Sequence, residues 1–156
     1  MWVDERGSQV LDRAECIRLL TLGASSTDTV GRVGFAIDGV PIILPVNYGM
    51  VDGDVVVRTG EGVKLLSALQ RAVVAFEIDS IDHPHKVAWS VLVRGLCAEV
   101  VDEAEVARAR AATPASLVAE PGDRYLRIRT GVLTGRRFPL REDDGEAALA
   151  HAPAPA

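Results

Sequence analysis

Two tight-turn signals, Asp38-Gly39 and Asp52-Gly53, each lie between runs of β-branched and aliphatic residues. An Asp-Gly pair accepts the positive φ angles that a two-residue β-hairpin requires. The flanking runs therefore predict three consecutive antiparallel strands at 33–37, 40–50 and 55–59. A chain that opens in this way is expected to build an antiparallel barrel or sandwich rather than alternating βαβ units. No glycine-rich dinucleotide fingerprint or P-loop follows any of the predicted strands.

The second of these strands carries two prolines, Pro41 and Pro45. Proline has no backbone N–H, so it is confined to edge strands, bulges or places where a strand leaves its ladder. We therefore expect the strand at 40–50 to have something other than a neighbouring strand along part of its length.

The rest of the chain follows a simple order of helix, strands, helix and two strands. Asp12 with Glu15 and Asp102 with Glu105 have the spacing of helix capping boxes, and Gly23 and Thr113-Pro114 are expected to end the two helices. Gly95 is the expected bending point of a long strand that serves two sheets. Helices are predicted at 12–22 and 102–112, with further strands at 72–79, 87–101, 125–130 and 132–140.

These elements predict one mainly β domain over residues 1–140 with a few short helices. Residues 141–156 are Ala/Pro-rich and acidic and are expected to form a flexible tail. Apolar residues make up 48% and charged residues 25%, which is ordinary for a globular chain.

Charge and apolar patterning disfavour two kinds of partner. The net charge of -5 gives no overall positive field for nucleic acid or an anionic membrane. No run approaches the ~20 apolar residues of a membrane span, and the first residues do not resemble a signal peptide. Cys16 and Cys97 are far apart and outside any C-x-x-C pair, so free buried thiols in a cytoplasmic protein are expected.

The segment 55–66 has the features of a phosphate site. A strand ends at Arg58 and Thr59, two glycines follow, and Lys64 falls in the first turn of a predicted helix. Free N–H groups, the helix dipole and a cation would then meet at one place, where a phosphate is stable. From the residues alone, a solvated glycine turn explains the pattern about as well.

Several segments in a fixed order resemble the flavin-binding core of the pyridoxamine 5'-phosphate oxidase-like family, in particular its short bacterial branch. The resemblance extends over most of residues 11–140 and rests on GRVGFAIDGVPIILPVNYG, RTGEGVKL, AVVAFEID, WSVLVRG and VLTGRRF. It implies an antiparallel FMN-binding split β-barrel with an N-terminal helix, working as a homodimer with the flavin at the subunit interface.

The resemblance also implies roles for particular residues. The strand around Asn47 would run beside the isoalloxazine ring, the segment from Arg58 to Lys64 would hold the phosphate, and the start of WSVLVRG would approach the flavin of the partner subunit. Tyr48 and Trp89 fit core positions equally well. The implied cofactor-binding residues are Pro45, Val46, Asn47, Tyr48, Arg58, Thr59, Lys64, Trp89 and Ser90.

The function expected from this is an FMN-dependent oxidoreductase with a small-molecule electron donor and acceptor. A flavin carrier or sensor without turnover is an alternative, as is a deazaflavin-dependent reductase on the same fold. Family members that oxidise pyridoxamine phosphate have a C-terminal Arg-x-His pair that is not found here, which puts that activity in doubt.

Two further patterns suggest sites but have simpler explanations. His83 and His85 flank a proline, which favours a surface loop over a metal or haem site. Arg124, Arg127 and Arg129 alternate with apolar residues, as on a half-exposed strand, so we expect a solvated face and not a nucleic-acid stripe.

Overall fold

The computed structural model of the protein describes residues 7–26, 29–59, 69–114 and 124–140. Within them the chain forms two helices and nine strands, with every strand pair antiparallel. In chain order these are β1 (Gln9–Leu11), α1 (Arg13–Ala24), β2 (Gly31–Ile37), β3 (Val40–Val46), β4 (Tyr48–Val51), β5 (Asp54–Thr59), β6 (Val73–Asp82), β7 (Val87–Glu99), α3 (Glu103–Ala112), β8 (Arg124–Ile128) and β9 (Val132–Pro139). The mainly β prediction is confirmed.

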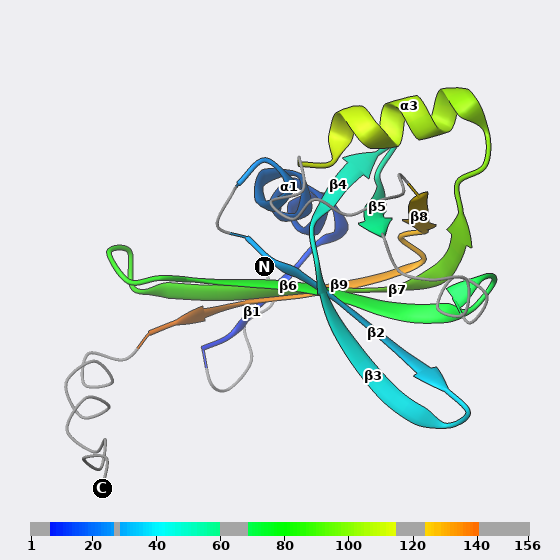
Figure 1. The fold of residues 1–156 in the computed structure, drawn as a ribbon. Helices are drawn as coiled ribbons and strands as arrows, with labels where there is room; N and C mark the ends of the chain where they lie inside the picture. Colours follow the sequence, from blue (N-terminus) through cyan, green and yellow to red (C-terminus); the bar gives the residue numbers. More distant parts are fainter. Residues whose placement is uncertain (1–6, 27–28, 60–68, 115–123, 141–156) are drawn as a thin grey trace, which may run out of the picture.

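The strands form one curled sheet in the order β3-β2-β6-β7-β8-β5-β4, with β9 pairing β7 and β1 pairing β9. We call β1, β9, β7, β6, β2 and β3 the long wing, and β4, β5, β8 and the end of β7 the short wing (Figure 1). The two ends of the order, β3 and β4, are consecutive in the chain and meet at Asn47. The sheet therefore curls back on itself, and the β3–β4 junction is where the barrel is split.

The Asp-Gly turns form as predicted. Asp38 and Gly39 have φ angles of 50° and 80°, and Asp52 and Gly53 have 53° and 80°. The strand predicted at 40–50 is in fact two strands, β3 and β4, which lie in different wings. The proline argument is confirmed, because β3 is an edge strand whose only strand partner among the described residues is β2.

β7 passes from one wing to the other at Gly95. Its residues 87–94 pair β9, and its residues 97–99 pair β8. A Cβ at Gly95 would collide with the backbone carbonyl oxygen of Arg129. The two segments are held together here, because the Arg129 N–H donates to Leu96 O at 3.0 Å. The predicted bending point is thus a place where two backbones approach too closely for a side chain.

Both helices begin as predicted, since Asp12 accepts from Glu15 N at 2.8 Å and Asp102 from Glu105 N at 3.0 Å. The prediction that Gly23 ends the first helix is wrong, because α1 continues to Ala24. Gly23 is buried, and a Cβ there would collide with the Tyr48 hydroxyl. This glycine is required for packing against β4.

The core has two parts. The larger lies inside the curl, where α1 and the inward residues of both wings pack around Tyr48 and Phe76, whose rings meet edge to face at 4.9 Å. The smaller joins α3 to the outer side of the short wing through Val56, Tyr125 and Ala109. β5 is buried on both sides, which explains its continuous apolar run.

The expectation that Arg127 lies on a solvated face is also wrong. Its side chain is 22% exposed and lies 2.9 Å from Asp54 and 3.2 Å from Glu105. Arg127 therefore ties β8 to the β4–β5 hairpin and to α3. In the described part of the chain, neither helix is long and apolar enough to cross a membrane.

Candidate functional site

Two segments that the family resemblance implies for flavin binding lie side by side in the structure. They are the strand around Asn47, implied for the isoalloxazine ring, and the end of β5, implied for the phosphate. Tyr48 on β4 pairs with Val57 on β5, so Asn47 lies one residue beyond this pair, on the side of Arg58. Asn47 is exposed and belongs to neither β3 nor β4. The β3–β4 junction and the end of β5 thus form one continuous region at the split of the barrel.

Side chains along the junction point in different directions. Pro45 is exposed on the outer side of β3, whereas Val46 packs against the main core. Tyr48 is 1% exposed and donates its hydroxyl to Leu20 O at 2.8 Å, and burial raises its pKa. Its ring is therefore a core group, and only the backbone near it faces the split.

At the end of β5, Arg58 and Thr59 lie on opposite faces. Thr59 shares the inward face of Val55 and Val57 and is 9% exposed, whereas Arg58 shares the face of Val56. Both side chains interact with other groups of the protein. Lys64 lies outside the described residues, so the cradle from 58 to 64 is described only at its first two residues.

Trp89 and Ser90 are not part of this region in the same chain. They lie on β7, three strands away from β3, which corresponds to roughly 14 Å across the sheet. They also point to opposite faces, because Trp89 packs against the core with Val91, whereas Ser90 is on the outer face opposite Arg136. One ligand cannot contact both side chains from one face of β7.

A charged cluster that the sequence analysis did not find lies on the outer face of the long wing. Arg32 on β2 bonds Asp79 at 2.7 Å and Glu77 at 3.2 Å, both on β6. Burial and the neighbouring Asp79 raise the pKa of Glu77. The alternation of side chains in the sequence could have predicted that Arg32, Glu77 and Asp79 point outward. Their proximity follows only from the pairing of β2 with β6.

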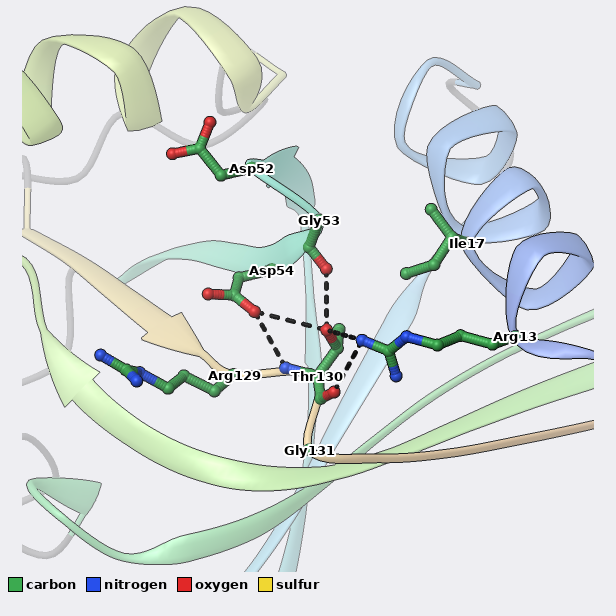
Figure 2. Close-up of a pocket in the computed structure, with 8 residues that line it drawn as sticks. All are labelled: Arg13, Ile17, Asp52, Gly53, Asp54, Arg129, Thr130 and Gly131. Carbon is green, nitrogen blue, oxygen red and sulfur yellow. Dashed lines mark hydrogen bonds between the residues drawn. The ribbon is translucent and has the colours of Figure 1, made fainter.

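A hollow of about 530 Å³ lies elsewhere, between the start of α1, the β4–β5 turn and the β8–β9 turn (Figure 2). Thr130 is at its centre. Arg13 donates to Thr130 O at 3.1 Å and to its Oγ1 at 3.2 Å, and the Thr130 N–H donates to Asp54 at 3.0 Å. The Thr130 hydroxyl donates to Gly53 O at 2.9 Å.

The two carboxylates of this hollow already have partners within the protein. Asp54 is paired with Arg127, and Asp52 with Arg108. Arg129 has no such partner in the described part of the chain, and its side chain extends away from Arg13 (Figure 2). We therefore interpret the hollow as a link between three chain segments and not as a ligand site.

The two histidines lie at the exposed turn between β6 and β7. The Nδ1 atom of His85 is 2.8 Å from Asp82, and the carboxylate also accepts the His85 backbone N–H at 3.0 Å. These contacts lower the pKa of Asp82. Among the described residues no group of three or more His, Cys, Asp or Glu side chains could hold a metal ion.

Comparison with known proteins identifies the family. A family model described as pyridoxamine 5'-phosphate oxidase matches residues 12–137. The chain belongs to the pyridoxamine 5'-phosphate oxidase family. This match covers every described element from α1 to β8 and most of β9, and it includes the β3–β4 junction and the end of β5.

Solved structures of this family share the fold. A protein from Mycobacterium smegmatis named as an FAD binding protein is 34% identical, covers 85% of this chain and 100% of its own, and has a TM-score of 0.71. A Corynebacterium glutamicum protein provisionally described as a pyridoxamine 5'-phosphate oxidase is 30% identical, covers 85% and 99%, and has a TM-score of 0.73. The curled antiparallel sheet is therefore the split barrel of this family.

A curated relative is an uncharacterized protein of Mycobacterium tuberculosis, 43% identical over 103 residues. That alignment covers 63% of this chain and 64% of the relative. The chain thus spans somewhat less than two thirds of that relative.

Proposed function

We propose that the protein is an FMN-dependent oxidoreductase acting on small molecules, with the isoalloxazine ring along the β3–β4 junction and the phosphate at the end of β5. One observation carries this proposal. The pairing of Tyr48 with Val57 brings the exposed Asn47 next to Arg58, so the proposed ring site and the proposed phosphate site would lie side by side at the split.

The residues present fit such a ligand. β3 and β4 are the two ends of the sheet order, so each has a side along which no described strand pairs. Backbone N–H and C=O groups on such a side can bond the polar edge of a flat ring, as they would bond another strand. Pro45 reduces the donors on β3, which favours a ligand over an added strand.

In this proposal the protein's residues position the cofactor. The backbone from Pro45 to Tyr48 orients the ring, and the buried Tyr48 side chain fixes that backbone by its bond to Leu20. Arg58, Thr59 and Lys64 hold the phosphate, which has to lie beyond the end of β5 because the side chains of Arg58 and Thr59 are on opposite faces of that strand. When bound, the flavin supplies the transfer of electrons between a small-molecule donor and acceptor.

The proposed active unit is a homodimer with each flavin at the subunit interface. Ser90 lies on the outer face of the long wing, where a second copy could reach it, whereas Trp89 packs into its own core. Of the two residues implied for the partner's flavin, we therefore favour Ser90.

FAD is a second candidate cofactor, because the 34% identical M. smegmatis protein is named as an FAD binding protein. FAD contains the ring, ribityl chain and first phosphate of FMN, so the same residues would bind that half. A deazaflavin reductase and a flavin carrier without turnover are the other readings of the same site.

Absorption spectra and ligand titration separate these possibilities. We expect the purified protein to carry FMN or to quench FMN fluorescence on titration, and to oxidise NADH or NADPH in its presence. Tighter binding of FAD than of FMN would make FAD the cofactor. Binding of a deazaflavin but not of FMN would make the deazaflavin the cofactor. Tight FMN binding with no response to reduced nicotinamides would favour a carrier.

Replacement of Lys64 tests the phosphate site. We expect Lys64→Ala to weaken FMN binding by about tenfold to a hundredfold, because loss of a charged hydrogen bond costs roughly 1.5 to 3 kcal/mol. The control is Lys86→Ala, since Lys86 lies at the β6–β7 turn, away from the junction. Equal losses in both variants would show a general charge effect and no specific cradle.

We also propose a cytoplasmic location. Cys16 and Cys97 are both free and buried, and burial raises the pKa of both thiols. Such thiols are typical of proteins from a reducing compartment.

A further inference from the structure

The short wing ends in a row of polar side chains next to the proposed phosphate site. Thr59, the last residue of β5, pairs with Arg124, the first residue of β8. Directly paired residues of antiparallel strands have side chains on the same face, with Cβ atoms about 5 Å apart. Thr59 is on the inward face, so Arg124 is there too. A phosphate beyond the end of β5 therefore also lies beyond the start of β8.

This position separates Arg124 from Arg127, with which the sequence groups it. The alternation of β8 puts Leu126 and Ile128 on the face of Arg124, in the main core, whereas Arg127 is on the opposite face and bonds α3. Among the described residues of β5, β7 and β8, Arg124 is the only cation on the inward face. Its side chain is 48% exposed, so it is accessible to a ligand at the end of these strands.

Glu99 is the next member of the row. It lies at the end of β7 and pairs with Leu126 on β8, so Glu99 and Arg124 are diagonal neighbours on one face. The Arg124 Nε is 3.4 Å from the Glu99 carboxylate. Across β5, β8 and β7 the inward face thus presents a hydroxyl, a guanidinium and a carboxylate side by side.

The end of β7 is fixed on its other side as well. Residues 70–72 run along it, with two backbone hydrogen bonds of 2.8 Å to Cys97. The Glu99 N–H donates to the Gln70 side-chain oxygen at 2.8 Å. The Glu99 side chain is 26% exposed, about half the value for Arg124. The carboxylate is therefore the fixed partner of the pair, and the guanidinium is the accessible one.

A phosphate is a stronger partner for this guanidinium than Glu99 is. A guanidinium has more N–H donors than one carboxylate takes up, so Arg124 can bond a second anion. A phosphate monoester carries nearly two negative charges at neutral pH, against one for a carboxylate. Glu99 opposes the binding of such an anion, because it partly neutralises Arg124 and adds a like charge nearby.

We propose that Arg124 binds the first phosphate of the flavin, and that Glu99 lowers the affinity for this phosphate by holding Arg124. The inference rests on the proposed function and adds two residues that the family resemblance did not imply. Riboflavin has no phosphate, so the effect of both residues is confined to FMN and FAD.

Titration with flavins that differ in their phosphate tests the role of Arg124. Arg124→Gln is expected to raise the Kd of FMN about tenfold, because a charged hydrogen bond is lost, and to leave the Kd of riboflavin within about twofold. FAD should follow FMN. Arg124→Lys keeps the charge and should recover part of the loss. Arg129→Gln is the matched control, since it removes an exposed arginine just past the other end of β8 and should leave both constants unchanged.

A double-mutant cycle tests the role of Glu99. Glu99→Gln should lower the Kd of FMN about threefold, which is the size of effect expected for a half-exposed ion pair, and leave that of riboflavin unchanged. Most of this gain should disappear when Arg124→Gln is also present. An equal gain in both backgrounds would show that Glu99 repels the phosphate directly, and would overturn its role through Arg124.

The ratio of the FMN and riboflavin constants separates a lost phosphate contact from a damaged fold. Equal losses of FMN and riboflavin affinity in Arg124→Gln would overturn the inference, as would equal losses of FMN affinity in Arg124→Gln and Arg129→Gln. If Lys64→Ala weakens FMN binding and Arg124→Gln does not, the proposed function stands and the inference fails. A wild-type protein that binds riboflavin as tightly as FMN would refute the phosphate site itself, and this inference with it.

Discussion

At the scale of single residues, the main result is that Gly23 and Tyr48 depend on each other. Gly23 removes a side chain from α1 where the Tyr48 hydroxyl reaches Leu20 O. The bond to Leu20 O thereby fixes Tyr48, the first residue of β4, next to the proposed ring site. Helix propensity makes glycine about 1 kcal/mol less favourable than alanine in a helix. Here the packing against Tyr48 makes glycine the more favourable residue.

Gly23→Ala is accordingly expected to destabilise the protein by about 1 to 3 kcal/mol, although the same change in an exposed helix stabilises it. Thermal or urea unfolding measures the effect. In a Tyr48→Phe background the cost should fall, because the colliding oxygen is gone. A stabilising effect of Gly23→Ala in the wild type would show that the contact is not tight.

At the scale of elements, ion pairs join helices to strands that are distant in the sequence. Glu15 on α1 bonds Arg18 at 2.7 Å on the same helix and Arg137 on β9 at 2.5 Å. These bonds, with that of Arg18 the larger cause, lower the pKa of Glu15 from 4.5 to about 2. The lowered pKa means that the folded state prefers the ionised carboxylate.

The stability that Glu15 contributes is therefore present above about pH 4.5 and is lost as the pH falls from there toward 2. Because the side chain is 26% exposed, we expect only about 1 kcal/mol. Glu15→Gln should lower the free energy of unfolding by this amount at pH 7. Between pH 5 and 2 the free energy of unfolding of the variant should also fall less than that of the wild type, by roughly the same amount. Parallel pH curves for the variant and the wild type would contradict the assignment.

At the scale of the whole molecule, the curl of the sheet makes the candidate site. β3 and β4 are neighbours in the chain but opposite ends of the sheet order, so the split opens at Asn47. The Gly95 crossing of β7 gives the sheet its two wings and leaves the long wing with an outer face that no described helix covers.

The last described strand, β9, pairs with both β7 and β1, and Leu140 N donates to Lys86 O at 2.8 Å. We therefore expect a chain shortened after residue 141 to melt within about 2 °C of the full chain and to bind FMN equally well, because the Ala/Pro-rich residues beyond it have little apolar surface to bury. Differential scanning calorimetry and titration test this. A large drop in Tm would show that the tail docks on the domain.

The sequence by itself determined the hairpins, the helix starts and the edge strand. Asp-Gly turns, Asp N-caps and prolines act through φ angles and hydrogen bonds within a few residues, so their effects are local. The family resemblance added the fold and the implied flavin residues. These local signals could not tell where a strand changes wing, which is why 40–50 was predicted as one strand.

Only the tertiary structure decided which side chains face one another. The alternation of β7 separates Trp89 from Ser90, and the pairing of β2 with β6 assembles Arg32, Glu77 and Asp79 from residues more than forty positions apart. Gly23 was predicted as a helix end because its true constraint, the Tyr48 hydroxyl, comes from a strand that folds onto α1. Such contacts depend on register and curl, which are set by burial over the whole sheet and not by any one segment.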